Sequence, residues 1–545
     1  MKKPAVLTGA LWGALFTLPL LAVLYVGLSV AGLPFAPFEM FDWIARALPG
    51  GLITFGIDTM VSVIIALGLP TSETAKTAEQ LMAIVFTIGI GAVVGAIFFA
   101  VMNATQKARN DLLPGLVVGL GFGLPLYVMG LAVSSSVTMV EPLRAAVWTL
   151  GVFVAWGYAL SLVWNHFAFA PRASAAATAP NAEALDRRRF LVQMGAGAAV
   201  ITVVGAGVGT LLRRDTATRV ADASALPSAQ STAETTPLPN AGDSVQPAPG
   251  TRPEVTPIDN HYRIDINTLP PAVAEAGYVL PIVNRLSGSS GETVREFTLD
   301  EIRAMPPTDA YITMSCISNR LGGDLISTTR WTGVSMQYFL EQVGVPEGAT
   351  HLRMVSADGF DETVALDLIA NDERVMLTWA WDGEPLRQQH GFPLRIHIPD
   401  LYGMKQPKWI TLMEFLDRDE DGYWVRRGWD KDAVVRATSV IDTVAVNETF
   451  ESNGATFVPV GGIAWAGDRG ISAVQVRVDN GAWEDAQVRA PISDRTWVLW
   501  RYDWAFAEGS HTFEVRCTEG DGTPQIEERA DVRPSGATGI VRYSI

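Results

Sequence analysis

The stretch TMSCISNRLGGDLI, residues 313–326, carries one of the chain's two cysteines and decides how the rest of the sequence is interpreted. It follows the strand-like run 311–314 and leads into the pair Gly322-Gly323. We therefore expect Cys316 to lie at the end of a strand, where its thiol can reach a bound group. The two adjacent glycines would let the backbone approach that group closely. A thiolate is the ligand that a soft metal centre prefers. A lone cysteine is more often a structural residue than a metal ligand, so the neighbouring motifs determine which role is predicted for Cys316.

Several further motifs stand in a fixed order around this cysteine. They are RWTGV at 330–334, HGFPLR at 390–395, PDLYGMK at 399–405, KW at 408–409 and GIAWAGDRGI at 462–471. With these motifs, residues 257–545 resemble the sulfite oxidase family, and nothing before residue 257 contributes to the resemblance. The resemblance implies one molybdopterin whose molybdenum is held by a dithiolene and one cysteine thiolate. By motif position, that ligand is Cys316.

The resemblance also implies a set of pterin contacts. They are Asn260, His261, Asp358, His390, Arg395 and Lys408. Chemistry agrees with most of this set, because a pterin phosphate suits a guanidinium fork and an ammonium, which Arg395 and Lys408 would supply. A pterin ring suits amide and imidazole partners, which Asn260, His261 and His390 would supply.

The substrate pocket departs from the family pattern. Asp259 and Leu321 stand where sulfite oxidases have arginines, and Trp429 stands at the position of the pocket tyrosine. A pocket without those donors binds a dianion such as sulfite at a high desolvation cost. Arg469 matches the family's remaining arginine, and it either lines the pocket or is an exposed turn residue. We predict Cys316, Arg469 and Trp429 as the catalytic positions.

These residues predict an oxidoreductase that transfers an oxygen atom, in a two-electron step, to or from a small sulfur-type or similar oxo substrate. The bacterial branch of the family that reduces protein methionine sulfoxide also lacks parts of the sulfite pocket. A reductase of methionine sulfoxide-like substrates, supplied with electrons from the membrane, is therefore the alternative. A non-enzymatic membrane receptor or scaffold with a degenerate pterin fold is a third hypothesis. The intact Cys316, Arg395 and Lys408 argue against a scaffold, which has no need of them together.

The apolar residues of the chain are concentrated before residue 213. Hydrophobic residues make up 48% of the sequence and the mean hydropathy is +0.21, both high for a soluble protein. Six apolar runs are each long enough to cross a hydrocarbon core of about 30 Å. They cover residues 5–32, 50–69, 81–102, 112–134, 143–167 and 190–212. We therefore predict a polytopic helical membrane bundle over residues 1–213.

Basic residues predict which side of the membrane each loop faces. If all six runs cross, one side holds Arg46, Lys107, Arg109, Arg172 and the cluster Arg187–Arg189. Cytoplasmic loops carry such an excess, so the N-terminus and all residues after 213 should lie outside. Lys2 and Lys3 argue against an outside N-terminus, which leaves the number of crossings open by one. The soluble half is outside in either case if Arg187–Arg189 stay inside.

The run Arg187–Arg189, followed by Phe190, Leu191 and an apolar segment, resembles a twin-arginine export signal. Such signals export folded proteins, often with a cofactor already inserted. The alternative is a plain positive-inside anchor.

The soluble half begins with a polar segment. Residues 214–256 are rich in Ala, Ser, Thr and Pro, a composition typical of a flexible linker. Residues 257–432 mix strand-like runs with helical stretches such as 333–344, which predicts an α+β domain that binds the molybdopterin.

Residues 433–545 alternate apolar and polar side chains in short runs, as in 474–478. Asp479-Asn480-Gly481 is a strong hairpin turn. We predict an immunoglobulin-like β-sandwich of the family's dimerisation type, with Cys517 on its core face. A homodimer follows only by analogy.

The remaining composition limits cofactors and partners. A net charge of -16 disfavours nucleic acid, and two cysteines are too few for an iron–sulfur cluster. His166 is alone before residue 213, so two histidines cannot hold a haem there, and no motif for covalent haem or flavin is present. We expect membrane lipid around the bundle, and a separate electron-transfer protein or a quinone as electron partner.

Overall fold

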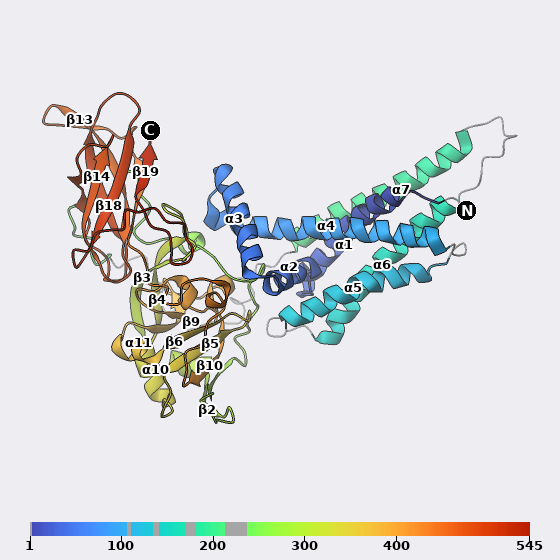
Figure 1. Cartoon of the computed structure of the whole chain (residues 1–545), viewed down its shortest axis with the longest axis horizontal. Helices are drawn as coiled ribbons and strands as arrows, with labels where there is room; N and C mark the ends of the chain where they lie inside the picture. Colours follow the sequence, from blue (N-terminus) through green and yellow to red (C-terminus); the bar gives the residue numbers. More distant parts are fainter. Residues whose placement is uncertain (1–2, 106–110, 135–140, 170–180, 213–236) are drawn as a thin grey trace. The chain divides into compact units, whose positions relative to one another are not determined.

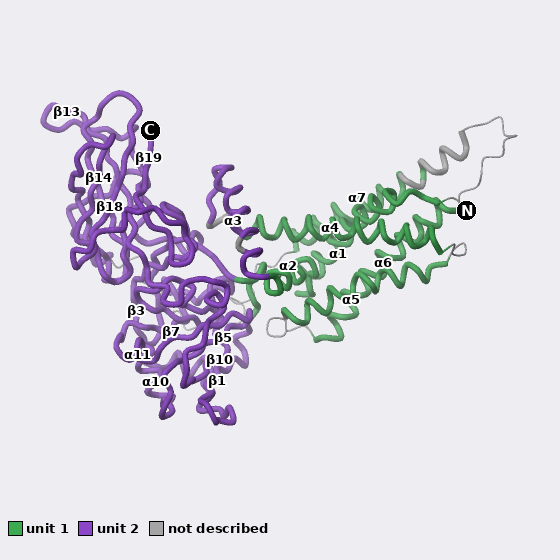
Figure 2. The backbone as a smooth tube through the Cα atoms, viewed as in Figure 1, with its two compact units in different colours: residues 1–48, 76–222, 266–272 green, residues 49–75, 223–265, 273–545 purple. Residues whose placement is uncertain are grey.

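The structure is a computed structural model, and it describes residues 3–105, 111–134, 141–169, 181–212 and 237–545 (Figure 1). Lys2, Lys107, Arg109 and Arg172 lie outside these described residues. The chain forms two compact units (Figure 2). Unit 1 comprises residues 1–48, 76–222 and 266–272, and unit 2 comprises residues 49–75, 223–265 and 273–545.

Unit 1 is helical. Its elements are α1 (Val6–Ala31), α2 (Ala36–Ala47), most of α4 (Thr71–Thr105), α5 (Leu113–Ser134), α6 (Pro142–Ala168) and α7 (Asn181–Leu211). Among the described residues, five helices are long and apolar enough to cross a membrane, and they lie in α1, α4, α5, α6 and α7. The sequence has six apolar runs. The run at 50–69 forms the shorter helix α3 (Gly50–Ala66), which belongs to unit 2.

Glycines set how closely two of the long helices approach. Gly9 and Gly13 of α1 face Gly91 and Gly95 of α4, and a side chain at Gly13 would collide with the backbone oxygen of Gly91. Small residues spaced four apart allow this backbone contact between membrane helices. The spacing therefore explains why apolar helices without a polar stripe still pair in one register.

One segment from the soluble half packs within unit 1. Residues 266–272, here called the docked loop, follow the predicted pterin contact at 261. Asp42 of α2 accepts hydrogen bonds from the Thr268 amide at 2.8 Å and from its hydroxyl at 2.5 Å. Arg46 donates to the Asn267 side-chain oxygen at 2.6 Å. Asn267 and Thr268 are buried, so the loop is held by specific polar contacts.

Two sheets build the part of unit 2 that surrounds Cys316. The first has the strand order β2-β1-β10-β5-β6. Its strands are β1 (Val279–Asn284), β2 (Thr293–Thr298), β5 (His351–Ser356), β6 (Asp361–Ala365) and β10 (Ile410–Leu416). The second has the order β3-β4-β7-β8, with β9 paired to β7. Its strands are β3 (Thr308–Ser315), β4 (Ile326–Ser335), β7 (Met376–Trp381), β8 (Glu384–Pro385) and β9 (Arg395–His397).

Short helices lie between these strands, as the mixed sequence pattern predicts. They are α9 (Leu299–Arg303), α10 (Met336–Val343) and α11 (Leu366–Asn371). We expected a helix over 333–344, but Gly333 and Val334 continue strand β4. Thr298 caps α9 with a capping box shared with Glu301. One core joins the helices to the strands, with Phe339 of α10 fully buried in it.

The C-terminal part of unit 2 consists of two antiparallel sheets. One contains β11 (Thr438–Val444), β12 (Phe450–Ser452), β13 (Ala455–Trp465), β16 (Gln487–Val488) and β17 (Val498–Ala505). The other contains β14 (Ile471–Val478), β15 (Glu484–Asp485), β18 (Thr512–Glu519) and β19 (Val541–Ser544). Residues from both sheets share one core, which includes Val460, Trp500 and Phe513. This is a β-sandwich, and the immunoglobulin-like assignment stays a prediction.

Part of the expected linker is packed. Residues 214–236 lie outside the described residues, whereas 237–256 contact the sandwich. Arg252 pairs with Asp442 at 2.6 Å, and the Asn240 amide donates to the Ala490 carbonyl at 2.6 Å. These contacts fix residues 237–256, so the segment expected to act as a tether is packed from residue 237 onward.

Candidate functional site

Cys316 directly follows strand β3, as the sequence predicts. Its amide donates to the Leu325 carbonyl at 3.0 Å, which closes the intervening loop back onto the start of β4. Gly322 in that loop has φ +73°, a left-handed conformation that favours glycine. The thiol is buried, with its Sγ 3.0 Å from the Ser318 hydroxyl. Burial raises the pKa of this thiol, and Ser318 opposes that rise.

The predicted contacts His261, His390 and Arg395 come together beside this strand. The two imidazole rings are 5.4 Å apart, and the Arg395 guanidinium lies 4.8 Å from the ring of Trp331. Arg395 also donates to the Met314 sulfur at 3.3 Å, which places it near the strand that ends at Cys316. Residues from two distant parts of the sequence, around 261 and around 390–395, thus share one buried site.

Several buried donors in this site have no hydrogen-bond partner among the described residues. They are Arg395 Nε, Arg263 Nη2, Trp331 Nε1 and Trp381 Nε1. The Nε2 atoms of His261 and His397 also have no partner, and they are acceptors, because Nδ1 of each neutral ring donates to an oxygen. A buried polar group without a partner costs about 1–3 kcal/mol. Such a concentration therefore favours a polar ligand that would satisfy these groups.

The charges of the site favour an anionic ligand. Lys408 donates to the Ile264 carbonyl at 3.0 Å and lies 3.6 Å from the Asp265 carboxylate. Burial, followed by the nearby Arg263 and Arg395, lowers its pKa, and Asp265 acts against them. Burial also lowers the pKa of Arg395 to about 10. Three cationic side chains are thus crowded together, and an added anion would relieve their repulsion.

The histidines of the site are neutral at neutral pH. Burial, and then the charge of Arg395, lowers the pKa of His261 to about 3. Burial and the proximity of His261 lower the pKa of His390 well below its ordinary value. Neutral imidazoles can both donate and accept hydrogen bonds, which suits a heterocyclic ring.

The structure places two other predicted contacts differently. Asp358 is buried at the turn between β5 and β6, where its carboxylate accepts from the Phe360 amide at 3.0 Å, and it acts electrostatically on Lys408. Asn260 is exposed at the end of the short helix η2 (Ile258–Asn260). Its neighbour Asp259 pairs with Arg387 at 2.5 Å. Asn260 is therefore not a member of the buried donor group.

Arg469 and Trp429 have contrasting surroundings. The Arg469 guanidinium pairs with Asp400, with Glu519 at 2.6 Å and with the Val435 carbonyl at 2.8 Å. Two carboxylates neutralise it, so in this conformation it offers little charge to a substrate. Trp429 is buried in the same apolar cluster as Ile317, which directly follows Cys316.

Sequence reasoning missed several residues of the site. His397 lies two positions after Arg395 on β9, and alternate residues of a strand share a face. That alternation would have identified it. Trp331 and Trp381 face the imidazoles from paired strands, a contact that only the β4–β7 register reveals.

Neither cysteine forms a disulfide, and Cys517 is buried in the sandwich core as predicted. Among the described residues, no group of three or more His, Cys, Asp or Glu side chains is placed to hold a metal ion. A metal at Cys316 would therefore take its other ligands from a cofactor.

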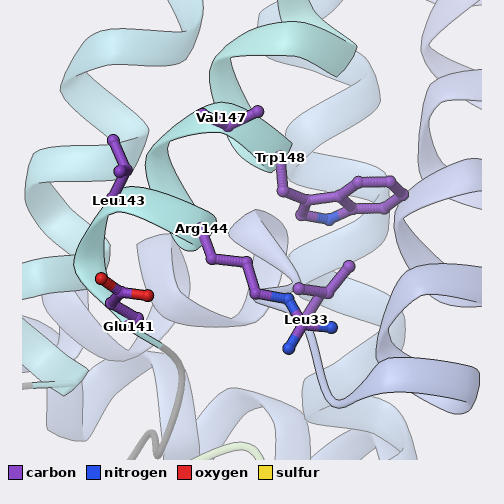
Figure 3. A pocket seen from close by; sticks show the side chains of 6 residues that line it. All are labelled: Leu33, Glu141, Leu143, Arg144, Val147 and Trp148. Carbon is purple, nitrogen blue, oxygen red and sulfur yellow. The ribbon is translucent and has the colours of Figure 1, made fainter.

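A separate cavity of about 430 Å³ lies in unit 1 (Figure 3). Its lining is formed by Leu33, Glu141, Leu143, Arg144, Val147 and Trp148. The lining is mostly apolar, and it contains none of the predicted site residues.

Residues 271–424 match a family described as the oxidoreductase molybdopterin binding domain. The chain is 22% identical to a sulfite oxidase of Arabidopsis thaliana over 335 residues, which cover 52% of this chain and 84% of that protein. It is 29% identical over 134 residues to YedZ1 of Azospira oryzae, named as a candidate protein-methionine-sulfoxide reductase subunit, covering 25% of this chain and 49% of that protein. It spans about half the length of the human mitochondrial sulfite oxidase. The sulfane dehydrogenase SoxCD of Paracoccus pantotrophus aligns with TM-score 0.46 and 20% identity, covering 55% of this chain and 86% of that one.

Proposed function

The chain is a molybdopterin oxidoreductase of the sulfite oxidase family, and from this premise we propose that it transfers an oxygen atom to or from a small sulfur-type or similar oxo substrate. The observation that carries the proposal is the group of buried donors without partners next to the strand that ends at Cys316. This group has the charge and the hydrogen-bonding capacity that a pterin phosphate and a pterin ring require.

The residues of the chain would divide the cofactor between them. Arg263, Arg395 and Lys408 would bind its anionic groups, because their positive charges lie close together with Asp265 as a near counter-ion. The neutral His261 and His390, joined by His397 and the two tryptophans, would contact the ring system. Cys316 would be the protein ligand of molybdenum. When bound, the cofactor supplies a metal centre that can exchange two electrons.

The proposed reaction balances with water as the oxygen source. In the oxidising direction the substrate gains one oxygen atom from water, and two protons and two electrons leave. In the reducing direction the substrate loses its oxygen as water and consumes two protons and two electrons. The electrons pass to or from a separate electron-transfer protein or a quinone. The mostly apolar lining of the unit 1 cavity suits a lipid-soluble molecule such as a quinone.

The surroundings of Cys316 favour a substrate with little net charge. Arg469 is neutralised by Asp400 and Glu519, and Leu321 cannot donate a hydrogen bond. A methionine sulfoxide-like substrate, reduced with electrons from the membrane, is therefore the second candidate. The similarity to YedZ1 also favours this candidate.

We propose that unit 1 anchors the chain in a membrane through five crossings, with α3 remaining on one side. Five crossings put Lys2, Lys3 and the basic residues of the loops after α4 and α6 on one side. The cluster Arg187–Arg189, at the start of α7, lies on that same side. A basic side is cytoplasmic, so the residues after α7 would lie outside. This count also removes the conflict that Lys2 and Lys3 raise against six crossings.

We propose the following boundaries for the domains. Residues 1–213 would be the membrane part, 257–432 the catalytic domain and 433–545 an immunoglobulin-like domain. A dimer interface on this last domain is proposed only by analogy. The run Arg187–Arg189 would serve either as a twin-arginine export signal or as a plain anchor.

An assay with artificial electron partners tests the proposed function. The purified full-length chain, made in a host that supplies the cofactor, is mixed either with sulfite and ferricyanide or with a methyl sulfoxide and reduced viologen. We expect turnover of the sulfoxide to exceed turnover of sulfite, and Cys316→Ser to abolish both. A cofactor-loaded protein that turns over neither class of substrate would refute oxygen transfer to sulfur compounds.

A further inference from the structure

Helix α3 presents an unusual apolar surface within unit 2. Its 17 residues contain one charged side chain, Asp58. Phe55 is 72% exposed and Val63 is 53% exposed, and Leu52, Ile57 and Ile65 are exposed as well. Water-facing helices of soluble domains carry a polar stripe on that side. These exposed apolar residues are spread around the helix, and a helix that is apolar all round is typical of a segment surrounded by protein or lipid.

The position of α3 in the chain identifies what covers this surface. It lies between α1 and α4, which are both long and apolar enough to cross a membrane. If both cross, the whole connection between them stays at one bilayer face. At 1.5 Å per residue, 17 residues span about 26 Å, less than a hydrocarbon core of about 30 Å. The helix is therefore placed to enter one leaflet from that face.

Two contacts join α3 to the surroundings of Cys316. The Ser62 hydroxyl accepts a hydrogen bond from Arg320 at 3.4 Å, and Arg320 lies four residues after Cys316. Gly50, at the start of the helix, packs against the backbone of Arg427. These contacts come from the loops that contain the metal-ligand candidate and the residues before Trp429.

An electrostatic interaction adds to these two contacts. Arg533 lies 4.5 Å from the ring of Trp429, and burial lowers its pKa while the charge of Asp58 opposes that effect. The single charged residue of α3 thus faces a cation at the edge of the candidate substrate region. Its position explains why an otherwise apolar helix keeps a carboxylate.

We propose that α3 inserts its apolar side chains into the lipid acyl chains of one leaflet, and that its contact with Arg320 and its charge interaction with Arg533 hold the edge of the Cys316 site at the membrane surface. The proposal rests on the membrane anchoring proposed above. It makes the bilayer, not a second protein, the partner of this surface. A substrate or electron partner would then reach the site from the membrane–water interface.

Spin-label accessibility tests the insertion. Phe55→Cys, Val63→Cys, Val117→Cys and Val345→Cys are labelled one at a time in the full-length chain in phosphatidylcholine nanodiscs. Val63, Val117 and Val345 are all exposed valines, so they are matched in kind. Val117 lies in α5, and Val345 lies after α10 in unit 2. The unsubstituted chain reports any labelling of the buried Cys316 and Cys517, and retained molybdenum shows that each variant is folded.

We expect the labels at 55 and 63 to relax with oxygen and to be protected from a water-soluble nickel chelate, as at 117. The label at 345 should show the reverse. Labels at 55 and 63 that match 345 while 117 remains in lipid would overturn the inserted helix and leave the anchoring intact. A label at 117 that is open to the chelate would refute the anchoring itself.

A label at Asp324→Cys tests the second half of the proposal. Asp324 lies in the same loop as Arg320, and its replacement leaves the Arg320–Ser62 contact in place. We expect an accessibility between those of positions 63 and 345, and a label at 324 that is as open to the chelate as the one at 345 would overturn the placement of the site at the membrane surface.

Discussion

Replacement of Arg395 by glutamine should affect the apoprotein and the cofactor-loaded protein in opposite directions. Burial lowers the Arg395 pKa from its ordinary value of 12.5 to about 10, which corresponds to roughly 3 kcal/mol of unfavourable free energy for the charged form. Arg395→Gln removes this cost. It also loses the guanidinium contact with Trp331, about 0.5–2 kcal/mol, and the hydrogen bond to the His390 carbonyl, about 1 kcal/mol. The apoprotein should therefore gain about 1 kcal/mol.

In the loaded protein the same change removes a charged donor to the cofactor. A hydrogen bond to a charged group contributes about 1.5–3 kcal/mol, so affinity should fall roughly 10- to 150-fold. The thermal midpoint of the apoprotein, followed by tryptophan fluorescence, should rise by about 2–4 °C if unit 2 unfolds with the entropy of a domain of ordinary size. The pterin retained after gel filtration should fall at the same time.

A control separates this effect from a general loss of stability. Arg353 on β5 pairs with Asp361 at 3.1 Å and with Glu414 at 3.0 Å, outside the donor group. Arg353→Gln should lower the midpoint of both forms without selective loss of pterin. If Arg395→Gln lowered the apoprotein midpoint and retained the pterin, Arg395 would serve the fold, and the reasoning would be refuted.

Three further predictions concern other parts of the chain. Glu362→Gln should destabilise unit 2 by about 3 kcal/mol in denaturant unfolding, because it leaves the buried Lys405 ammonium, 2.8 Å from Glu362, without its counter-charge. A double change to Met at both positions should recover most of the loss, and a single variant as stable as the parent would contradict this. Asp42→Ala should speed amide exchange in the docked loop about 30-fold, because about 2 kcal/mol of hydrogen bonding is lost. Asp42→Asn should exchange at a rate closer to that of the parent, and an unchanged rate in Asp42→Ala would show that the loop is held by packing alone. The Asp479 carboxylate, 2.6 Å from the His511 ring, raises the pKa of His511 above 6.5, so the stability from this pair is present below pH 6.5 and is lost as the pH rises through the raised pKa. His511→Gln should remove that pH dependence from thermal unfolding. A pH dependence that persists in the variant would belong to another group.

Local patterns in the sequence were sufficient to predict much of the fold. Alternation at 474–478 and the turn Asp479-Asn480-Gly481 predicted strand β14 and its hairpin, and both Asp479 and Asn480 adopt positive φ. The buried Cys517 followed from the same alternation. Hydropathy alone did not separate α3 from the longer helices, because an apolar run reports burial in apolar surroundings and not whether the chain crosses.

The candidate site was predictable where residue chemistry was decisive. His261, His390 and Arg395 were expected together and lie together. The neutralisation of Arg469 was not predictable, because its partners Asp400 and Glu519 are 69 and 50 residues away. Pairing across such distances depends on how the domains pack, which no local pattern encodes.

The most direct test of the central claim is molybdenum analysis of the purified full-length chain, made in a host that synthesises the cofactor, beside Cys316→Ser. We expect near-stoichiometric molybdenum and pterin in the parent chain. We expect the serine variant to keep pterin through the Arg395 and Lys408 contacts but to lose the parent's redox-active molybdenum spectrum. A parent chain free of molybdenum and pterin, or a serine variant with the parent's spectrum, would contradict Cys316 as the ligand of a bound molybdenum cofactor.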